Sequence, residues 1–309
     1  MSHHYGYVPV LCSAFLFGVS NTVNKMLLEQ LSPLMIASVT YIIAGTFLGA
    51  MSFLPQRTRL TSWLKLPSNT RTKPARKDIV LLFLIALFGG VLAPSINLLG
   101  LNNTTAVSAS LLGNTETLFT IAIAFVFLRE RGRPKDYAAM ALLILGAVIL
   151  TTDLNFQEIA SQGTFIGNVL IVVAAFCWGI DNNLSRPVTA RRSLLHVGSL
   201  KGIVGGGILF TVASLYGYRI LPSLFAVSWL VIMGIFSVGI SLVLFLFSIQ
   251  QIGAMRTGVI FSTGSLFGAV TAFLVLHEPI SLLQVLAGCL MLSAIYVLSI
   301  PKKESTSLG

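Results

Sequence analysis

Long runs of apolar residues cover almost the whole chain and are separated by short polar or charged stretches. A transmembrane α-helix needs about 20 predominantly apolar residues, and most of the runs have that length. Bounded by charged residues, proline or asparagine, the runs predict ten transmembrane helices. The predicted spans are residues 7–27, 33–54, 79–101, 105–128, 137–152, 164–185, 194–217, 222–249, 254–276 and 281–300. A count of nine or eleven stays open, because the fifth span is short and the third and fourth nearly merge.

The composition excludes an ordinary soluble protein of 309 residues. Hydrophobic residues make up 55% of the chain, charged residues make up 10%, and the mean hydropathy is +0.88. Soluble domains carry about 25% charged residues. Ten helices with short loops leave no room for a large extramembrane domain. All three cysteines lie in apolar runs, which argues against a disulfide framework or a zinc cluster.

The net charge of +10 is explained by topology rather than by nucleic-acid binding. All but three of the 20 basic residues fall on one side of the predicted membrane, in the stretches 55–78, 129–136 and 186–193, at Arg256 and near the C-terminus. The exceptions are Lys25, Lys201 and Arg219. Lys and Arg are enriched in cytoplasmic loops, so both termini are predicted to be cytoplasmic. The expected partners are the lipid bilayer and a small-molecule substrate, with no nucleic acid.

The two halves of the chain resemble each other. Residues 118–150 align with residues 266–298 without a gap, and segment 14–18 (AFLFG) aligns with segment 175–179 (AFCWG). The shared positions in the longer match are Leu118/Leu266, Phe119/Phe267, Ala124/Ala272, Phe125/Phe273, Leu128/Leu276, Glu130/Glu278 and Ala139/Ala287. We expect one repeat of five helices over residues 1–153 and a second over residues 154–309. An odd number of spans inverts the second repeat in the membrane, an arrangement typical of secondary transporters.

Several motifs resemble the EamA-type transporters of the drug/metabolite transporter superfamily. The Phe17-Gly18 and Trp178-Gly179 pairs are similar to that family's aromatic-Gly motif, and segment 114–120 (NTETLFT) resembles its fourth-helix signature. The resemblance covers nearly the whole chain. It implies a carrier of small metabolites, often an exporter, with a central cavity, in a prokaryotic plasma (inner) membrane. The chain departs from the family pattern at Thr117 and Ser265, where Pro is common, and near Tyr41, where a basic residue is common.

Glu116 is the only carboxylate predicted to lie in the middle of a span. Ionised groups are costly at that depth, so Glu116 is a candidate for protonation and for coupling transport to protons. Asn114 is next to it in sequence and is a candidate hydrogen-bond partner. The alternative is a Glu that only fixes helix packing.

A polar stripe in the sixth span is the second candidate site. Trp178, Asp181 and Asn182 have i, i+3, i+4 spacing and share one helix face. Phe17 and Asn21 belong to the matching stripe in the first span. An aromatic wall beside amides and a carboxylate suits an amphipathic solute or an amino acid. The alternative is that Asp181 and Asn182 anchor the helix near Arg186.

Asn97 in the third span is a further substrate-cavity candidate, although membrane amides often only join helices by hydrogen bonds. We therefore expect a secondary transporter, with possible proton coupling and without cofactor or metal. A nucleotide-sugar or sugar-phosphate exchanger is the alternative, and it would need several Lys or Arg residues in the cavity. An intramembrane enzyme is disfavoured, because the sequence has no HExxH or GxSxG motif and no intramembrane pair of Asp residues.

Overall fold

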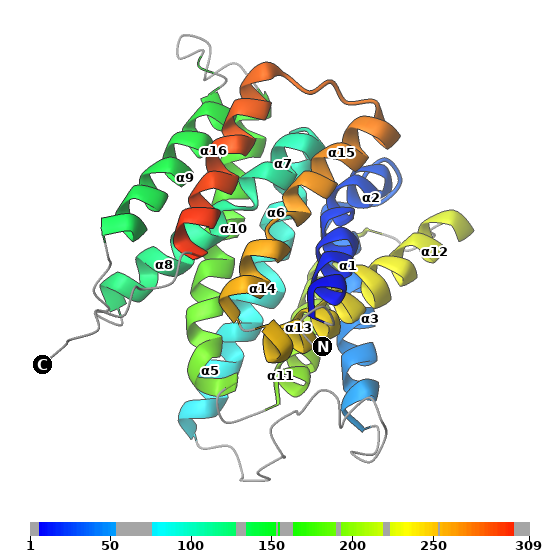
Figure 1. The fold of residues 1–309 in the computed structure, drawn as a ribbon. Helices are drawn as coiled ribbons and strands as arrows, with labels where there is room; N and C mark the ends of the chain where they lie inside the picture. Colours follow the sequence, from blue (N-terminus) through cyan, green and yellow to red (C-terminus); the bar gives the residue numbers. More distant parts are fainter. Residues whose placement is uncertain are drawn as a thin grey trace, which may run out of the picture.

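The computed structural model describes residues 6–53, 76–127, 134–152, 154, 163–189, 193–218, 223–252 and 254–299. Over these residues the chain is helical and contains no strand (Figure 1), so the predicted all-α fold is confirmed. Eight helices are long and apolar enough to cross a membrane, and two further apolar helices, Gly264–Leu276 and Leu282–Leu298, are shorter. The count of ten spans therefore stays a prediction. The basic stretches 54–75 and 128–133, which include Glu130, lie outside the described residues.

The first half of the chain contains five predicted spans, and three of them consist of shorter helical segments. Two of the spans are interrupted by a turn and one by a π-helical segment. The elements are α1 Tyr7–Gly18, α2 Ser20–Leu27, α3 Pro33–Phe53, α5 Arg76–Ile85, η2 Ala86–Leu92, α6 Ala93–Asn102, α7 Ala106–Leu112, α8 Thr115–Phe127 and α9 Pro134–Thr152.

The second half follows a similar order. It too contains a π-helical segment, and a turn at residues 262–263 divides its penultimate predicted span. The elements are α10 Gly163–Thr189, α11 Leu194–Leu215, α12 Leu224–Ile232, η4 Met233–Ile240, α13 Ser241–Ile252, α14 Ala254–Phe261, α15 Gly264–Leu276 and α16 Leu282–Ser299.

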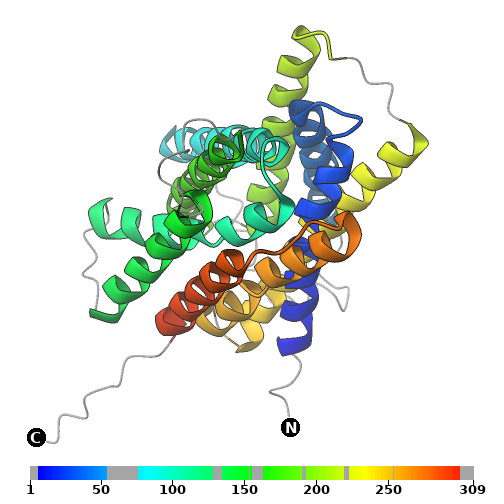
Figure 2. The same cartoon turned by 90° about the horizontal axis from the view of Figure 1, so that it is seen from above.

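The main helix contacts join the two halves. Helix α3 packs along α11, α9 packs along α16, α10 packs on α6 and α8, and α1 packs on α13 and α15 (Figures 1 and 2). Glycines make the closest of these approaches possible. A Cβ added to Gly45 on α3 would lie 2.6 Å from the backbone N of Ile203 on α11, and one added to Gly202 would lie 2.6 Å from the Tyr41 carbonyl. Small residues let membrane helices pack with their backbones in contact.

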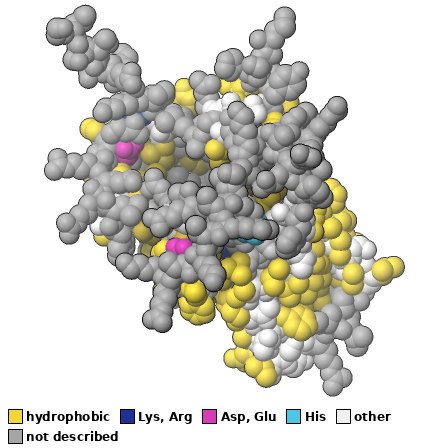
Figure 3. Space-filling view, turned by 90° about the horizontal axis from the view of Figure 1, so that it is seen from below, with side chains coloured by type: hydrophobic (Ala, Val, Ile, Leu, Met, Phe, Trp, Pro, Cys, Tyr) yellow, Lys and Arg dark blue, Asp and Glu magenta, His cyan; other side chains and the backbone are white. Residues whose placement is uncertain are grey.

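The outside of the bundle is apolar. Large hydrophobic side chains are strongly exposed on several helices, for example Leu215 (82%), Leu224 (83%) and Leu282 (74%). Hydrophobic side chains also cover much of the described surface in Figure 3. A continuous apolar surface of this extent is suited to contact with lipid rather than water.

One end of the bundle, which we call the Glu278 end, contains the turns at residues 28–32, 103–105 and 277–281. Its polar contacts centre on the turn between α6 and α7. The Lys25 ammonium donates hydrogen bonds to the carbonyl oxygens of Leu101 (2.7 Å) and Thr104 (2.6 Å). These contacts tie α2 to the last carbonyls of α6, where a cation is favoured by the helix dipole.

Glu278 binds the other side of the same turn. Its carboxylate accepts hydrogen bonds from the backbone N–H groups of Ala106 (2.9 Å) and Val107 (3.0 Å) at the start of α7. His277, which precedes it, has a left-handed backbone (φ 53°) that ends α15. Glu278 thus joins the loop after α15 to α7 and satisfies N–H groups that lack partners within the helix.

Candidate functional site

Helix α10 carries the predicted polar stripe, and the structure divides that stripe between two environments. Asp181 is buried with 2% of its surface exposed, Trp178 is half-buried and Asn182 is exposed. A helix turns once in about 3.6 residues, so neighbouring side chains point in directions roughly 100° apart. Asp181 and Asn182 therefore contact different helices and cannot be treated as one acid–amide pair.

Asp181 forms an ion pair with Lys201 on α11. The Lys201 ammonium lies 2.7 Å from Oδ2 of Asp181, and the Ser185 hydroxyl donates to Oδ1 over 3.1 Å. The two partners are buried unequally, because the Asp181 side chain is 3% exposed and the Lys201 side chain is 26% exposed. The pair connects α10 to α11 within the apolar bundle.

The π-helical segment η2 packs against this ion pair. A Cβ added to Gly89 would lie 2.1 Å from Oδ2 of Asp181, and one added to Gly90 would lie 2.7 Å from the carbonyl oxygen of Lys201. Only glycine at position 89 leaves room for the Asp181 carboxylate, which Lys201 and Ser185 hold in place. Single π-helical turns often occur at functional sites, and this one sets the backbone of η2 against charged groups.

Glu116 contacts the other half of the stripe. Its Oε1 accepts a hydrogen bond from the Asn182 amide over 2.7 Å, and the same amide lies 3.2 Å from the Thr120 hydroxyl. Asn183 donates to the carbonyls of Thr120 (3.0 Å) and Gly179 (2.9 Å), which holds α10 against α8. Glu116 itself is half-buried.

Tyr41 on α3 brings an aromatic hydroxyl to the same place. Its side chain interacts with that of Trp178 and lies within electrostatic range of Lys201, Asp181 and Glu116. Side chains from α3, α8, α10 and α11 therefore converge beside η2. We call this set the polar cluster, and its members are Tyr41, Glu116, Trp178, Asp181, Asn182 and Lys201.

Two of the remaining predicted site residues, Asn114 and Asn21, join helices by hydrogen bonds outside the polar cluster. Asn114 donates to the Ser265 hydroxyl at the start of α15 (3.1 Å), and Asn21 donates to the Ser110 hydroxyl on α7 (3.1 Å).

Two predicted residues show no such tie. The Phe17 ring is 44% exposed and lies 5.3 Å from the ring of Phe261. Asn97 is half-buried on α6. No contact observed here tests their roles, which stay predictions.

Lys201 and Tyr41 belong to the polar cluster, although neither is among the site residues predicted from the sequence. Lys201 carried a usable signal, because a lysine inside an apolar span needs an acidic partner and Asp181 belongs to the preceding span. Tyr41 carried a weaker signal: the resembled family commonly has a basic residue near this position, but a tyrosine in an apolar helix is itself common. Arg256 is the basic residue at the start of the ninth predicted span, and its side chain lies outside the described residues.

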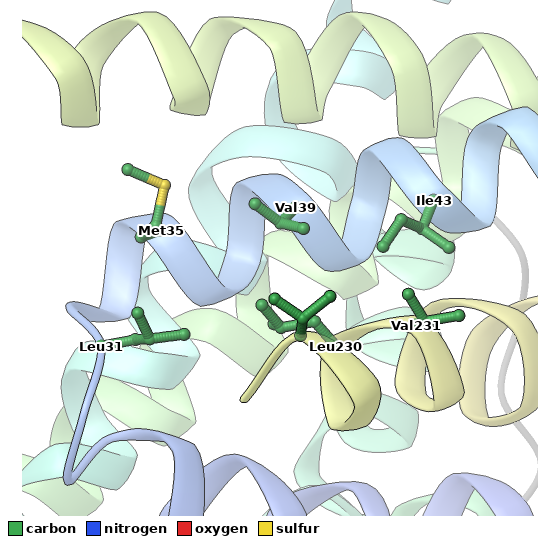
Figure 4. A pocket seen from close by; sticks show the side chains of 7 residues that line it. Leu31, Met35, Val39, Ile43, Leu230 and Val231 are labelled. Carbon is green, nitrogen blue, oxygen red and sulfur yellow. The ribbon is translucent and has the colours of Figure 1, made fainter. Parts of the chain in front are cut away.

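A separate apolar groove lies between α3 and α12 (Figure 4). It has a volume of about 120 Å³ and contains no polar cluster residue. Its lining residues are Leu31, Met35, Val39, Ile43, Val227, Leu230 and Val231. A groove of this chemistry offers no group that orients a polar solute.

Charged and amide side chains inside an apolar helical bundle are typical of a polytopic membrane carrier. A model of the EamA-like transporter family matches residues 4–152 and 165–300. The chain belongs to the EamA-like transporter family.

Proteins from other prokaryotes are similar along most of the chain. An uncharacterized transporter of Methanothermobacter thermautotrophicus is 35% identical over 298 residues, which cover 96% of this chain and 87% of the relative. The uncharacterized transporter YetK of Bacillus subtilis is 21% identical, with coverage of 96% and 88%. A solved crystal structure has the same fold, with a TM-score of 0.65, 16% identity and 96% coverage of both chains. The protein is an integral membrane protein of a transporter family.

Proposed function

We propose that the protein is a secondary transporter that exports small organic metabolites by alternating access to the polar cluster. The observation that carries this proposal is the contact between Glu116 and Asn182. Glu116 is half-buried and Asn182 is exposed, although both lie within predicted spans. Exposure of such groups to lipid is costly, so the space beside them is most favourably filled by water or by a polar solute.

The proposed alternating access rests on two inverted repeats, and matching helix crossings support them. Phe15 on α1 meets Phe267 on α15 edge to face at 5.6 Å, and Phe176 on α10 meets Phe119 on α8 in the same way at 5.3 Å. Phe15 and Phe176 occupy equivalent positions of the sequence repeat, as do Phe267 and Phe119. Each aromatic-Gly helix thus crosses the fourth helix of the opposite half.

Irregular helical segments recur in the same order. The third predicted span of the first half contains η2, and its counterpart in the second half contains η4. Turns separate α7 from α8 and α14 from α15. These correspondences support repeats over residues 1–153 and 154–309 with ten spans in total. The distribution of Lys and Arg supports cytoplasmic termini.

The exchange of phosphorylated solutes receives less support. Lys25 and Lys201, which both lie within candidate spans, already have partners: Lys25 binds backbone carbonyls and Lys201 binds Asp181. A carboxylate and an amide beside Trp178 and Tyr41 instead suit a solute with an apolar body and a hydrogen-bonding head.

Transport by the full-length protein in reconstituted vesicles tests the proposal. Amino acids and small amines are loaded, and their efflux is measured with and without a pH gradient. We expect efflux of at least one solute that Glu116→Gln abolishes and that Glu29→Gln, a change to an exposed acid outside the cluster, leaves intact. The proposal would be contradicted if every solute left protein-free vesicles as fast as it left vesicles that contain the protein.

A further inference from the structure

We propose that Lys201 is a built-in counter-ion for Asp181, so that Glu116 is left to bind the solute and the solute carries one positive charge. This inference rests on the proposed transport function and deepens it. It assigns different tasks to the two acids of the polar cluster and names the solute class as organic monocations, for example primary amines with an apolar body.

The environment of Asp181 removes it from contact with a solute. Its carboxylate is almost completely buried, receives Lys201 at 2.7 Å and Ser185 at 3.1 Å, and is covered by the backbone of η2 at Gly89. A solute ammonium would have to displace a lysine and enter a space that a single added carbon would fill. Asp181 and Lys201 together contribute no net charge.

Glu116 is placed differently. The side chain shown to donate to its carboxylate is Asn182, whose amide is neutral and leaves the negative charge uncompensated. Asp181 and Lys201 both lie within electrostatic range of Glu116, and their opposite charges act on its carboxylate in opposite directions. The polar cluster therefore has one negative charge more than it has positive charges when Glu116 is ionised.

An unbalanced charge within the bilayer favours the binding of one opposite charge. A monocation at Glu116 makes the polar cluster neutral, whereas a dication leaves an excess positive charge. Trp178 and Tyr41 add aromatic surfaces, which attract organic cations. Lys201 sets this preference without touching the solute, and it is a positioning residue.

Removal of the lysine should change the preferred solute charge. In Lys201→Met, Asp181 loses its partner and the polar cluster carries two uncompensated acids, which favours a dication. Lys201→Arg keeps the charge and should keep the original preference. In the double variant Asp181→Asn/Lys201→Met both members of the pair are neutral, so the preference should return to the monocation.

Benzylamine and xylylenediamine are suitable probes, because they share an aromatic body and carry one and two ammonium groups. Their competition is measured as quenching or enhancement of tryptophan fluorescence in the purified full-length protein. We expect the wild type and Lys201→Arg to prefer benzylamine at least tenfold, Lys201→Met to lower this ratio at least tenfold, and the double variant to restore it. Thermal melting identifies variants that fail to fold. If Lys201→Met does not fold, the ratio of affinities is compared between the wild type, Lys201→Arg and the double variant.

Two results would overturn the inference. One is an unchanged ratio in folded Lys201→Met or, where that variant does not fold, loss of the monocation preference in the double variant. The other is Glu116-dependent transport of neutral or anionic solutes by a wild type that binds neither amine. That second result would leave the proposed transport function standing, whereas the absence of any transported solute would remove both.

Discussion

Adjacent residues on α10 perform different tasks in the polar cluster. Asp181 is packed against η2 and paired with Lys201, whereas Asn182 is exposed and donates to Glu116 on α8. The first pair joins α10 to α11, and the second places a half-buried acid beside an exposed amide. One turn of α10 thus pairs with Lys201 on α11 through Asp181 and with the candidate binding group Glu116 on α8 through Asn182.

Glu116→Gln is expected to fold normally and to lose transport driven by a proton gradient. An ionised carboxylate in the bilayer centre costs about 2.5–3.5 kcal/mol on insertion scales, so protonation of Glu116 and binding of a cation are competing ways to remove that cost. Gln keeps the shape and the contact with Asn182 but cannot exchange a proton. The titratable groups facing this position, Tyr41, Asp181 and Lys201, stay in place.

The measurement for Glu116→Gln is amine efflux from vesicles with an imposed pH gradient, together with amine binding in detergent. We expect gradient-dependent efflux to vanish and amine binding to weaken at least tenfold. Glu29→Gln serves as the matched control for a loss of one acid. Efflux that still follows the gradient in folded Glu116→Gln would contradict a coupling role.

Trp178→Ala should weaken binding of aromatic amines with little loss of folded protein. Trp178 is half-buried beside Tyr41, so truncation removes an aromatic wall worth about 0.5–2 kcal/mol for a cation, or roughly 2- to 30-fold in affinity. Trp178→Phe should retain part of the affinity. The readout is binding by equilibrium dialysis, and unchanged affinity in folded Trp178→Ala would assign the residue to packing alone.

The sequence predicted the chemistry of the polar cluster better than its geometry. Glu116, Trp178, Asp181 and Asn182 were predicted as candidates because polar groups are rare within apolar spans. The sequence did not predict that Asp181 pairs with Lys201 while Asn182 binds Glu116. Helical spacing shows which side chains share a helix face, but it does not show which residue of a neighbouring helix each one contacts. Lys201 and Asp181 meet only because α10 and α11 pack beside η2.

At the scale of elements, glycines determine where helices cross. Gly18 on α1 and Gly179 on α10 belong to the two aromatic-Gly motifs. A Cβ at Gly18 would lie 2.2 Å from the Gly264 carbonyl, and one at Gly179 would lie 2.8 Å from Cβ of Phe119. These motifs therefore have a packing role, which their resemblance to a family signature does not by itself reveal.

Gly179→Ala is expected to destabilise the protein, because the new methyl group would press on the side chain of Phe119 and on the backbone of α8. Overpacking of this kind typically costs about 1–3 kcal/mol. Gly207→Ala on α11 is the matched control, since no atom lies within 4 Å of the added Cβ and alanine favours the helix. Thermal melting in detergent should show a lower midpoint for Gly179→Ala and an equal or higher midpoint for Gly207→Ala. Equal midpoints in the wild type and Gly179→Ala would show that α8 can move away.

Hydropathy predicts where the helices lie along the chain, but it does not predict the π-helical segments within two of the spans. The predicted span 79–101 contains the π-helical turn η2, and the predicted span 222–249 contains η4. Both segments are apolar and contain two glycines each, which weaken an α-helix without specifying a π-helical turn. Their i→i+5 hydrogen bonds depend on packing, as at Gly89 against Asp181, which a single helix sequence does not specify.

At the scale of the whole molecule, the two halves pack against each other along most of their helices and do not form two separate bundles. Helices α3 and α11 pack along each other, and so do α9 and α16, while Glu278 of the second half binds the start of α7 in the first half. Movement between the halves must therefore break contacts at the Glu278 end. If the repeats are inverted as predicted, the residues of the second half that are equivalent to those at the Glu278 end lie at the opposite end of the bundle.

The inverted arrangement is testable by labelling single cysteines in intact cells. Extending the match of residues 118–150 with 266–298 towards the N-terminus pairs Asn103 with Gln251, and both are exposed at helix ends. Inverted repeats place them on opposite sides of the membrane, and the distribution of Lys and Arg places Asn103 outside. In a background with Cys12, Cys177 and Cys289 replaced by Ser, an impermeant maleimide should label Asn103→Cys directly and Gln251→Cys only after the membrane is permeabilised. Labelling of Gln251→Cys but not Asn103→Cys would keep the inversion and reverse the orientation. Labelling of both from the same side would mean that the halves are parallel, and alternating access between inverted repeats would no longer explain transport.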